Sequence, residues 1–252
     1  MNIIITGIPT YADDLISVLT AQGATVLHYD QKARYVSRLA DDHVALIIID
    51  DQADDWQFWV TTPKTSPATR RIPVAFITDD LIVAEQAHTN GADHIVSRAD
   101  LIAQVPSLLA SARSLTDETR AALLDQCDDP LPPDAHAAIQ RFNDGEYYAQ
   151  HDLFEALWMH DPRPVRDLYR AILQVGIAYY QIERGNWNGA HKMLVRSVQW
   201  LAILPDVCQS VDIGALKADA AAVRAELERV GASGIATFDK TLLKPVQYAT
   251  KL

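Results

Sequence analysis

A histidine, a carboxylate and an indole share one side of the segment from Gly145 to Pro162. His151 and Glu155 are four residues apart, and on a helix this spacing places them one turn apart on the same face. Trp158 extends that face by three residues. Glu155 could orient the imidazole of His151 and raise its basicity, which would prepare a general base or a metal ligand. The alternative is a buried polar network that sets the helix packing and performs no chemistry.

Two further polar residues follow this segment. Arg166 could hold an anionic ligand or pair with Glu155. Gln174 lies in an apolar helix, where a buried amide needs hydrogen-bond partners, and we expect it to reach the face that carries His151. A metal site would need more ligands, and the candidates, at spacings that define no particular metal, are His160, Glu183 and His191. The sequence thus predicts no cofactor, while a divalent metal bound by His151, Glu155 and His191 stays open.

Helical spacing of apolar residues runs through the second half of the chain, over residues 134–143, 146–160, 163–184, 186–204 and 212–230. Gly145, Gly185 and Pro205 separate these segments. A glycine, an aromatic residue two positions on and a histidine six positions on occur twice, forty residues apart. The pattern of glycine, acid and tyrosine before an amphipathic helix that ends in Asp-Pro resembles the tetratricopeptide repeat. We interpret the two copies as two helical hairpins packed into one bundle. Residues 134–252 are therefore expected to form an all-α domain with a mixed C-terminal tail.

Strand and helix patterns alternate in the first half. Five apolar segments indicate strands at Asn2–Thr6, Ala24–Tyr29, Val44–Asp50, Pro73–Thr78 and Asp93–Ser97. Helical spacing falls between and after them, at 11–22, 31–40, 81–89 and 100–113, with Pro106 expected in the first turn of the last helix. Strands that are apolar on both faces indicate a parallel sheet covered by helices on both sides. We expect an α/β domain over residues 1–114 and a linker over residues 115–133 that could contain a helix.

This order of elements, with an aspartate at the end of the third strand, resembles the receiver domain of response regulators over residues 2–113. The segments that carry the resemblance are Val44–Asp50, Pro67–Thr78 and Gly91–Arg98. The resemblance implies a flavodoxin-like fold with a five-stranded parallel sheet. It puts Asp50 where receivers carry the phosphate acceptor, Thr78 where they carry the switch hydroxyl, and Arg98 where they carry a lysine.

The chain departs from the receiver pattern where a receiver binds Mg²⁺. Thr6, Gly7 and Ile8 stand where receivers have an acidic pair, and Mg²⁺ needs carboxylate oxygens to offset its dehydration. Arg98 also replaces a compact ammonium group by a planar guanidinium. We therefore expect a domain that does not take phosphate, in which Asp50 pairs with Arg98 or caps a turn. The loop after this strand is expected to be solvated, and its carboxylates are Asp51, Asp54 and Asp55.

A second resemblance covers residues 134–205. The residues that carry it are Phe142–His151, Glu155, Trp158, Arg166, Gln174, Gly185 and Asn186. The spacing His-x-x-x-Glu-x-x-Trp resembles the bacterial and archaeal helical domain of unknown function 309. Carried over by position, the polar signature of that family falls on His151, Glu155, Arg166 and Gln174. The chain differs from the family at Asp152, where a glutamate is usual, and at Ala171, where a glycine is usual. The resemblance implies an all-α fold and no established reaction.

The composition argues against several classes of protein. A formal net charge of −11 is unsuited to nucleic acid, which needs clustered Lys and Arg, and to anionic membrane surfaces. No apolar segment is long enough to span a bilayer, and the N-terminal MNIIITGIP lacks the basic start of a signal peptide. Cys127 and Cys208 are too few for a disulfide framework or a thiolate metal site, and they suit a reducing cytoplasm.

These observations favour a cytoplasmic regulatory protein in which a degenerate receiver-like domain is coupled to a helical interaction module. Its binding partner would be another protein or a second copy of the chain, and it would catalyse no reaction. The alternative is a small hydrolase or metal-dependent enzyme centred on His151 and Glu155, with Arg166 as a further catalytic candidate.

Overall fold

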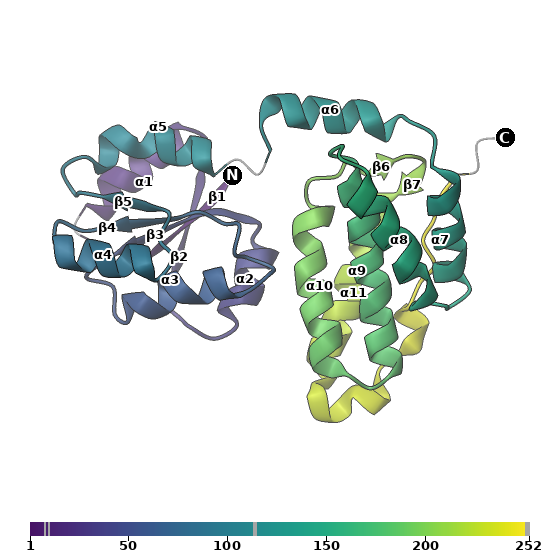
Figure 1. The fold of residues 1–252 in the computed structure, drawn as a ribbon. Coiled ribbons are helices and arrows are strands. Elements are labelled where there is room, and N and C mark those ends of the chain that lie inside the picture. The colour runs from purple at the N-terminus through teal and green to yellow at the C-terminus, as the bar shows by residue number, and fades with distance from the viewer. Residues whose placement is uncertain (8, 10, 113–114, 250–252) are drawn as a thin grey trace. The chain divides into compact units, whose positions relative to one another are not determined.

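The chain folds into two compact units, Met1–Ser114 and Leu115–Leu252. The computed structural model describes residues 1–7, 9, 11–112 and 115–249. The first unit is an α/β domain and the second is mainly helical (Figure 1). Each unit has a buried hydrophobic core of its own.

A five-stranded parallel sheet forms the centre of the first unit (Figure 1). Its spatial order is β2-β1-β3-β4-β5, and the strands are β1 (Asn2–Thr6), β2 (Thr25–Tyr29), β3 (Val44–Asp50), β4 (Val74–Ile77) and β5 (His94–Val96). The helices are α1 (Ala12–Ala21), α2 (Tyr35–Asp41), α3 (Trp56–Thr65), α4 (Leu81–Thr89) and α5 (Leu101–Ser111). β1, β3 and β4 are buried along nearly their whole length, because successive side chains enter cores on opposite faces of the sheet. The predicted five-stranded parallel sheet with helices is confirmed.

Two helices of this unit differ from the expected segments. α2 begins at Tyr35 instead of residue 31, because Arg34 adopts a left-handed backbone conformation (φ 55°) that a right-handed helix cannot include. Pro106 is the sixth residue of α5 and does not lie in its first turn, so that prediction was wrong. The helix accepts the interior proline at the cost of one backbone hydrogen bond. Arg113, the expected end of this helix, lies outside the described residues.

The described part of the second unit is built from α6 (Asp117–Cys127), α7 (Pro133–Asn143), α8 (Ala149–His160), α9 (Arg166–Glu183), α10 (Trp187–Leu201) and α11 (Ile213–Val230). Two 3₁₀ helices follow, η1 (Ala232–Thr237) and η2 (Lys240–Leu242). The predicted helical character is confirmed. The sequence predicted only helices before the tail. This was wrong in one place, because β6 (Val207–Cys208) and β7 (Val211–Asp212) form an antiparallel hairpin. Two-residue strands are too short to leave a periodic pattern in a sequence.

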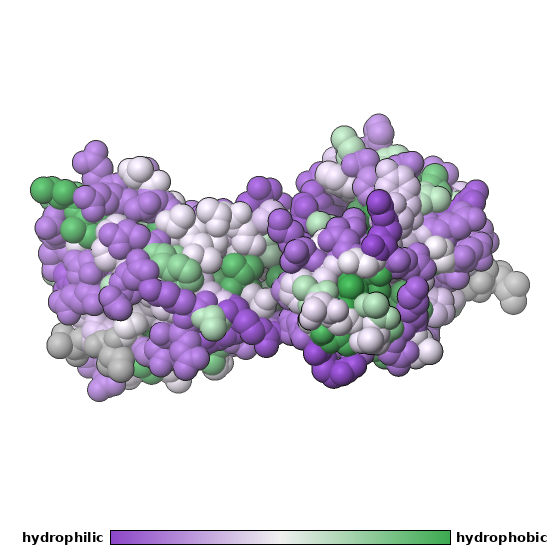
Figure 2. All heavy atoms as spheres, turned by 90° about the horizontal axis from the view of Figure 1, so that it is seen from below, coloured by the Kyte–Doolittle hydropathy of each residue, from purple (hydrophilic) through white to green (hydrophobic). Residues whose placement is uncertain are grey.

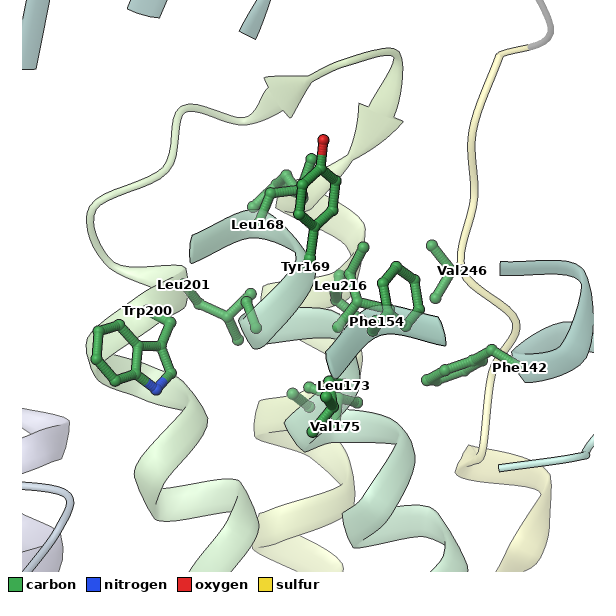
Figure 3. Close-up of a cluster of buried hydrophobic side chains, with 14 of the residues drawn as sticks. Phe142, Phe154, Leu168, Tyr169, Leu173, Val175, Trp200, Leu201, Leu216 and Val246 are labelled. Carbon is green, nitrogen blue, oxygen red and sulfur yellow. The ribbon is translucent and has the colours of Figure 1, made fainter. Parts of the chain in front are cut away.

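Helix α9 lies between α8 and α10 in this unit (Figure 1). Gly145 and Gly185, the two glycines of the repeat, have φ values of 79° and 68° and follow the ends of α7 and α9. Glycine adopts such positive φ values without steric cost, which lets the chain leave one helix and enter the next. The core combines side chains from α7 to α11 and the tail, and Figure 3 includes Phe142, Phe154, Tyr169, Leu201, Leu216 and Val246.

A disulfide bond joins Cys127, at the end of α6, to Cys208 in β6. The two cysteines are 81 positions apart in the sequence, and their Cα atoms are 4.2 Å apart. The sequence did not predict this pairing. The number of cysteines limits how many disulfides can form, but it does not tell which side chains the fold brings together.

The surface is mostly hydrophilic on the face that Figure 2 presents, with small and separate hydrophobic patches. Single exposed apolar residues are normal on soluble domains, and the most exposed of the large ones described are Leu81, Ile82, Met159 and Val207. Among the described helices, none combines the length and the apolar character that crossing a bilayer requires.

Candidate functional site

The carboxyl ends of β3, β4 and β5 meet at one edge of the sheet, because these strands are parallel neighbours. Asp50 ends β3, Thr78 follows β4, and Arg98 follows β5 by two residues. The fold therefore brings together the three residues that the sequence singled out here. Thr6 ends β1 at the same edge and is buried, while Ile8 lies outside the described residues. Asp50 is only 2% exposed, so its charge needs a partner.

Arg98 supplies that partner. Its Nη2 atom lies 3.1 Å from Oδ1 of Asp50 and also donates to Oδ1 of Asp51. Its Nη1 atom donates to Oδ2 of Asp79 at 3.2 Å, and its backbone N–H donates to Oδ1 of the same aspartate at 3.0 Å. One guanidinium thus binds three carboxylates that follow two neighbouring strands. Its fixed fork of N–H donors suits this arrangement better than a single ammonium group would.

Further donors complete the hydrogen bonding of the two central carboxylates. The hydroxyl of Tyr11 donates to Oδ2 of Asp50, and the backbone N–H of Gln52 donates to Oδ1 of Asp50 at 2.8 Å. The hydroxyl of Thr78 donates to Oδ2 of Asp51 at 2.5 Å. Thr78 therefore contacts Asp51 and not Asp50, the residue at the position of the phosphate acceptor. Both contacts considered for Asp50, the ion pair and the turn hydrogen bond, are present together.

The pKa values at this edge follow from these contacts. Burial disfavours the charged form of Asp51, but hydrogen bonds from Thr78 and Arg98 outweigh it and hold the pKa of Asp51 below its ordinary value. The hydrogen bond to Asp51 raises the pKa of Arg98 further above its usual range. Burial, reinforced by the hydrogen bond to Asp50, raises the pKa of Tyr11 well above its ordinary value. At neutral pH the arginine is charged and the tyrosine is a protonated donor, so the edge is a closed ionic network.

Three members of this network were missed in the sequence: Tyr11, Asp51 and Asp79. The expectation that Asp51 is solvated was wrong, because Thr78 and Arg98 contact it, whereas Asp54 and Asp55 are exposed as expected. The sequence could have indicated the two aspartates by their position at the ends of strands. Asp51 directly follows the end of β3, and Asp79 comes two residues after the end of β4. Tyr11 gave no such signal, because a loop carries it to the sheet edge.

On the helical unit, His151, Asp152 and Glu155 gather on α8. One ligand atom from each lies within 4.8 Å of the others. Nδ1 of His151 lies 3.2 Å from Oδ1 of Asp152, and the imidazole stacks on the ring of Tyr148 with the centroids 6.1 Å apart. The side chains of His151 and Asp152 are 28% and 78% exposed, so the cluster is open to solvent. One nitrogen and two carboxylate oxygens are suitable ligands for a divalent cation. The sequence had not marked Asp152 as a ligand.

The pairing expected for Glu155 is not formed. Its carboxylate makes no hydrogen bond or ion pair with any described residue, so it neither orients His151 nor holds Arg166. Arg166 begins α9 near Asp161 instead. The pKa of Asp161 is lowered mainly by a hydrogen bond from Arg163, and the charge of Arg166 adds to this effect. A spacing of four residues aligns two side chains on a helix, but it does not make them bond.

Trp158 has a packing role that the motif did not reveal. The guanidinium carbon of Arg170 lies 4.3 Å from the ring centroid of Trp158 on α8 and 4.1 Å from that of Trp200 on α10. Arg170 also lies 3.5 Å from Asp167 of the preceding turn. A cation between two indoles therefore joins three helices. The sequence missed this cluster, although Arg170 stands one turn before Gln174 in an otherwise apolar helix.

Gln174 is a buried amide that is only 4% exposed. Its Oε1 atom receives no hydrogen bond from the described part of the chain, so the predicted link to the His151 face is not formed. Gln150 is also buried, but its Nε2 atom donates to the carbonyl oxygens of Tyr147 at 2.9 Å and Leu173 at 3.4 Å. Of these two glutamines, Gln150 is the one whose hydrogen bond links α8 to α9.

Two of the other metal-ligand candidates, His191 and His160, contact residues outside the His151 cluster. Nε2 of His191 lies 3.0 Å from Oε1 of Glu228 on α11, and its ring stacks on Trp187. Nδ1 of His160 lies 2.7 Å from the carbonyl oxygen of Ala156. Within the described residues, the groups that could share a cation with His151 are those of its own helix.

The comparison with protein families concerns the helical unit. Residues 135–193 match the model of a family described as a domain of unknown function (DUF309). The matched segment runs from α7 into α10 and includes His151, Glu155, Trp158 and Gln174. The resemblance that the motif indicated is confirmed for this segment. The comparison with curated proteins finds no match.

Proposed function

We propose that this is a cytoplasmic regulatory protein, in which a receiver-like α/β unit that takes no phosphate is coupled to a helical interaction module. The module would bind another protein or a second copy of the chain. The observation that carries the proposal is the guanidinium of Arg98, which binds Asp50, Asp51 and Asp79 at once.

Phosphoryl transfer to an aspartate needs an accessible carboxylate oxygen and a divalent cation that neutralises developing charge. Both oxygens of Asp50 are already hydrogen-bonded, Oδ1 to Arg98 and Gln52 and Oδ2 to Tyr11. An arginine that is always charged stands in for the cation electrostatically. The strand order β2-β1-β3-β4-β5 is that of flavodoxin-like folds, which supports a receiver-like origin for this unit.

The test is to incubate the full-length protein with acetyl phosphate and Mg²⁺ and to measure its intact mass. We expect no phosphoryl group to be added, because Arg98 and Tyr11 occupy the acceptor. A Mg²⁺-dependent adduct mapped to Asp50 would mean an ordinary phosphorylation switch and would refute the proposal. Sedimentation velocity of the same sample then measures the oligomeric state and shows whether the partner is a second copy of the chain.

A metal-dependent enzyme is a second candidate, and the cluster of His151, Asp152 and Glu155 favours it. Three protein ligands would leave coordination positions for water, as catalytic metal sites do. Metal analysis of protein purified without chelator tests this candidate. Stoichiometric Zn²⁺, Mn²⁺ or Fe that is lost in His151→Ala and kept in His191→Ala would support it. Metal-free wild-type protein would count against it.

A further inference from the structure

The C-terminal end of α6 is held by two other parts of the helical unit. Cys127 is bonded to Cys208, and its carbonyl oxygen accepts a hydrogen bond from the backbone N–H of Gln209 at 2.6 Å. Oε1 of Gln126 accepts a hydrogen bond from the backbone N–H of Val165, which precedes α9, at 3.1 Å. These five residues are called the α6 clasp below.

The rest of α6 contributes little to its own attachment. Leu123 and Cys127 are its buried residues, and most of its other side chains are exposed. A helix of eleven residues is also marginal in water without tertiary contacts. The α6 clasp and the burial of Leu123 therefore keep this helix on the unit. α6 is the first helix of the helical unit, which begins at Leu115.

The hairpin turn beside the disulfide is strained. Gln209 and Ser210 have φ values of 49° and 67°, a left-handed conformation that such residues rarely adopt and that Asn-Gly usually occupies in hairpins. The hydroxyl of Tyr169 holds the turn by donating to Oε1 of Gln209 at 2.9 Å, and in Figure 3 this hydroxyl points toward the hairpin. Strained backbone persists only where its surroundings constrain it. Removing one constraint of the α6 clasp should therefore loosen the turn.

We propose that the Cys127–Cys208 bond is a redox-controlled cross-link that holds α6 on the helical unit. A dithiol reductant attacks one sulfur through its thiolate, forms a mixed disulfide and releases the other cysteine as a thiol. The second thiol of the reductant then displaces the remaining cysteine. The reductant loses two electrons and two protons and becomes a disulfide, and the protein gains two thiols. With the bond broken, α6 leaves the rest of the helical unit, whose next helix, α7, begins at Pro133.

Burial fits this role, and so does the cytoplasmic location that the proposed function includes. Cys127 is 7% exposed and Cys208 is not exposed, so reduction must wait for a local opening at the end of α6. In a reducing cytoplasm, the few disulfides that form are usually transient or redox-sensing. The inference does not depend on the state of Asp50 or on a metal at His151, so its test is separate from those of the proposed functions.

The experiment compares hydrogen exchange of the full-length protein before and after dithiothreitol, with thiol alkylation and intact mass to count the free thiols. We expect exchange over residues 117–127 to rise roughly tenfold or more on reduction, while exchange within α9 and α10 changes less than about twofold. The double variant Cys127→Ser with Cys208→Ser should resemble the reduced protein and should not respond to dithiothreitol. If circular dichroism shows that this variant is unfolded, the reduced wild type decides the question.

Three results would overturn the inference. Exchange in α6 that stays slow after complete reduction would mean that the bond does not hold the helix. Exchange that rises together across the whole helical unit would make the bond a general stabiliser. Protein that has two free thiols after air oxidation, with α6 still protected, would mean that the pair does not form the bond.

Discussion

The acidic edge of the sheet and the polar face of α8 contain similar residues but differ in how these residues are satisfied. At the edge, Asp50 and Asp51 are bonded to a fixed arginine and to neighbouring hydroxyl or backbone donors. On α8, Glu155 has no hydrogen-bond or ion-pair partner among the described residues, and Asp152 is mostly exposed. The difference lies in whether a cation from another element reaches the carboxylates. A closed buried network is costly to break, because removing one partner leaves an uncompensated charge, whereas an open one can accept a ligand.

The largest effect is expected from Arg98→Met. This change leaves the buried Asp50 and the half-buried Asp51 without their cation, so we expect the free energy of unfolding of the α/β unit to fall by about 3 kcal/mol. Urea unfolding with hydrogen exchange of the strand amides measures it. The matched control is Lys32→Met, which breaks an exposed pair with Asp55 and should cost less than about 1 kcal/mol. Equal losses in the two variants would mean that the edge is not a stabilising network.

A smaller effect is expected from Arg170→Met. It removes the charge between Trp158 and Trp200, and we expect the helical unit to lose about 1–2 kcal/mol. Arg166→Met is the control with the same change of side chain one turn earlier, and it should alter stability by less than about 0.5 kcal/mol. Urea unfolding of both full-length variants tests the pair. A larger loss of stability in Arg166→Met than in Arg170→Met would mean that Arg166 is the more important arginine of α9.

The stability of the α/β unit should also depend on pH. The pKa of Asp51 is lower in the folded protein, so its contribution to stability is present above its ordinary pKa and is lost as the pH falls through the lowered value. We expect the urea midpoint of the α/β unit to decline below about pH 4. Asp51→Asn should be less stable at neutral pH and less sensitive to acid. The same slope in variant and wild type would remove Asp51 as the cause.

The smallest effect is expected from His151→Ala. Its imidazole is partly exposed and bonds to an exposed carboxylate, so thermal stability should change by less than about 0.5 kcal/mol. Gln150→Ala, at the next position of the same helix, removes buried hydrogen bonds and should cost about 2 kcal/mol. A loss in His151→Ala as large as in Gln150→Ala would show that the α8 face belongs to the packed core.

The sequence by itself determined the features that depend on neighbours along the chain. The strand Val44–Asp50 is apolar up to its final aspartate, and helices such as α8 repeat their apolar residues at helical spacing. Gly145 and Gly185 marked the turns, because the conformational preference of glycine is a local property of the chain. The common face of His151 and Glu155 also followed from spacing, since the geometry of one helix defines it.

Only the tertiary structure decided which side chains meet. Arg98 reaches Asp51 and Asp79, Arg170 reaches Trp158 and Trp200, and Cys127 reaches a cysteine 81 residues away. Each of these contacts joins different elements, and their relative positions result from burying all the apolar faces of a unit at once. No local pattern records that outcome. This is why the polar residues of the motif were found in the sequence, while their actual partners were not.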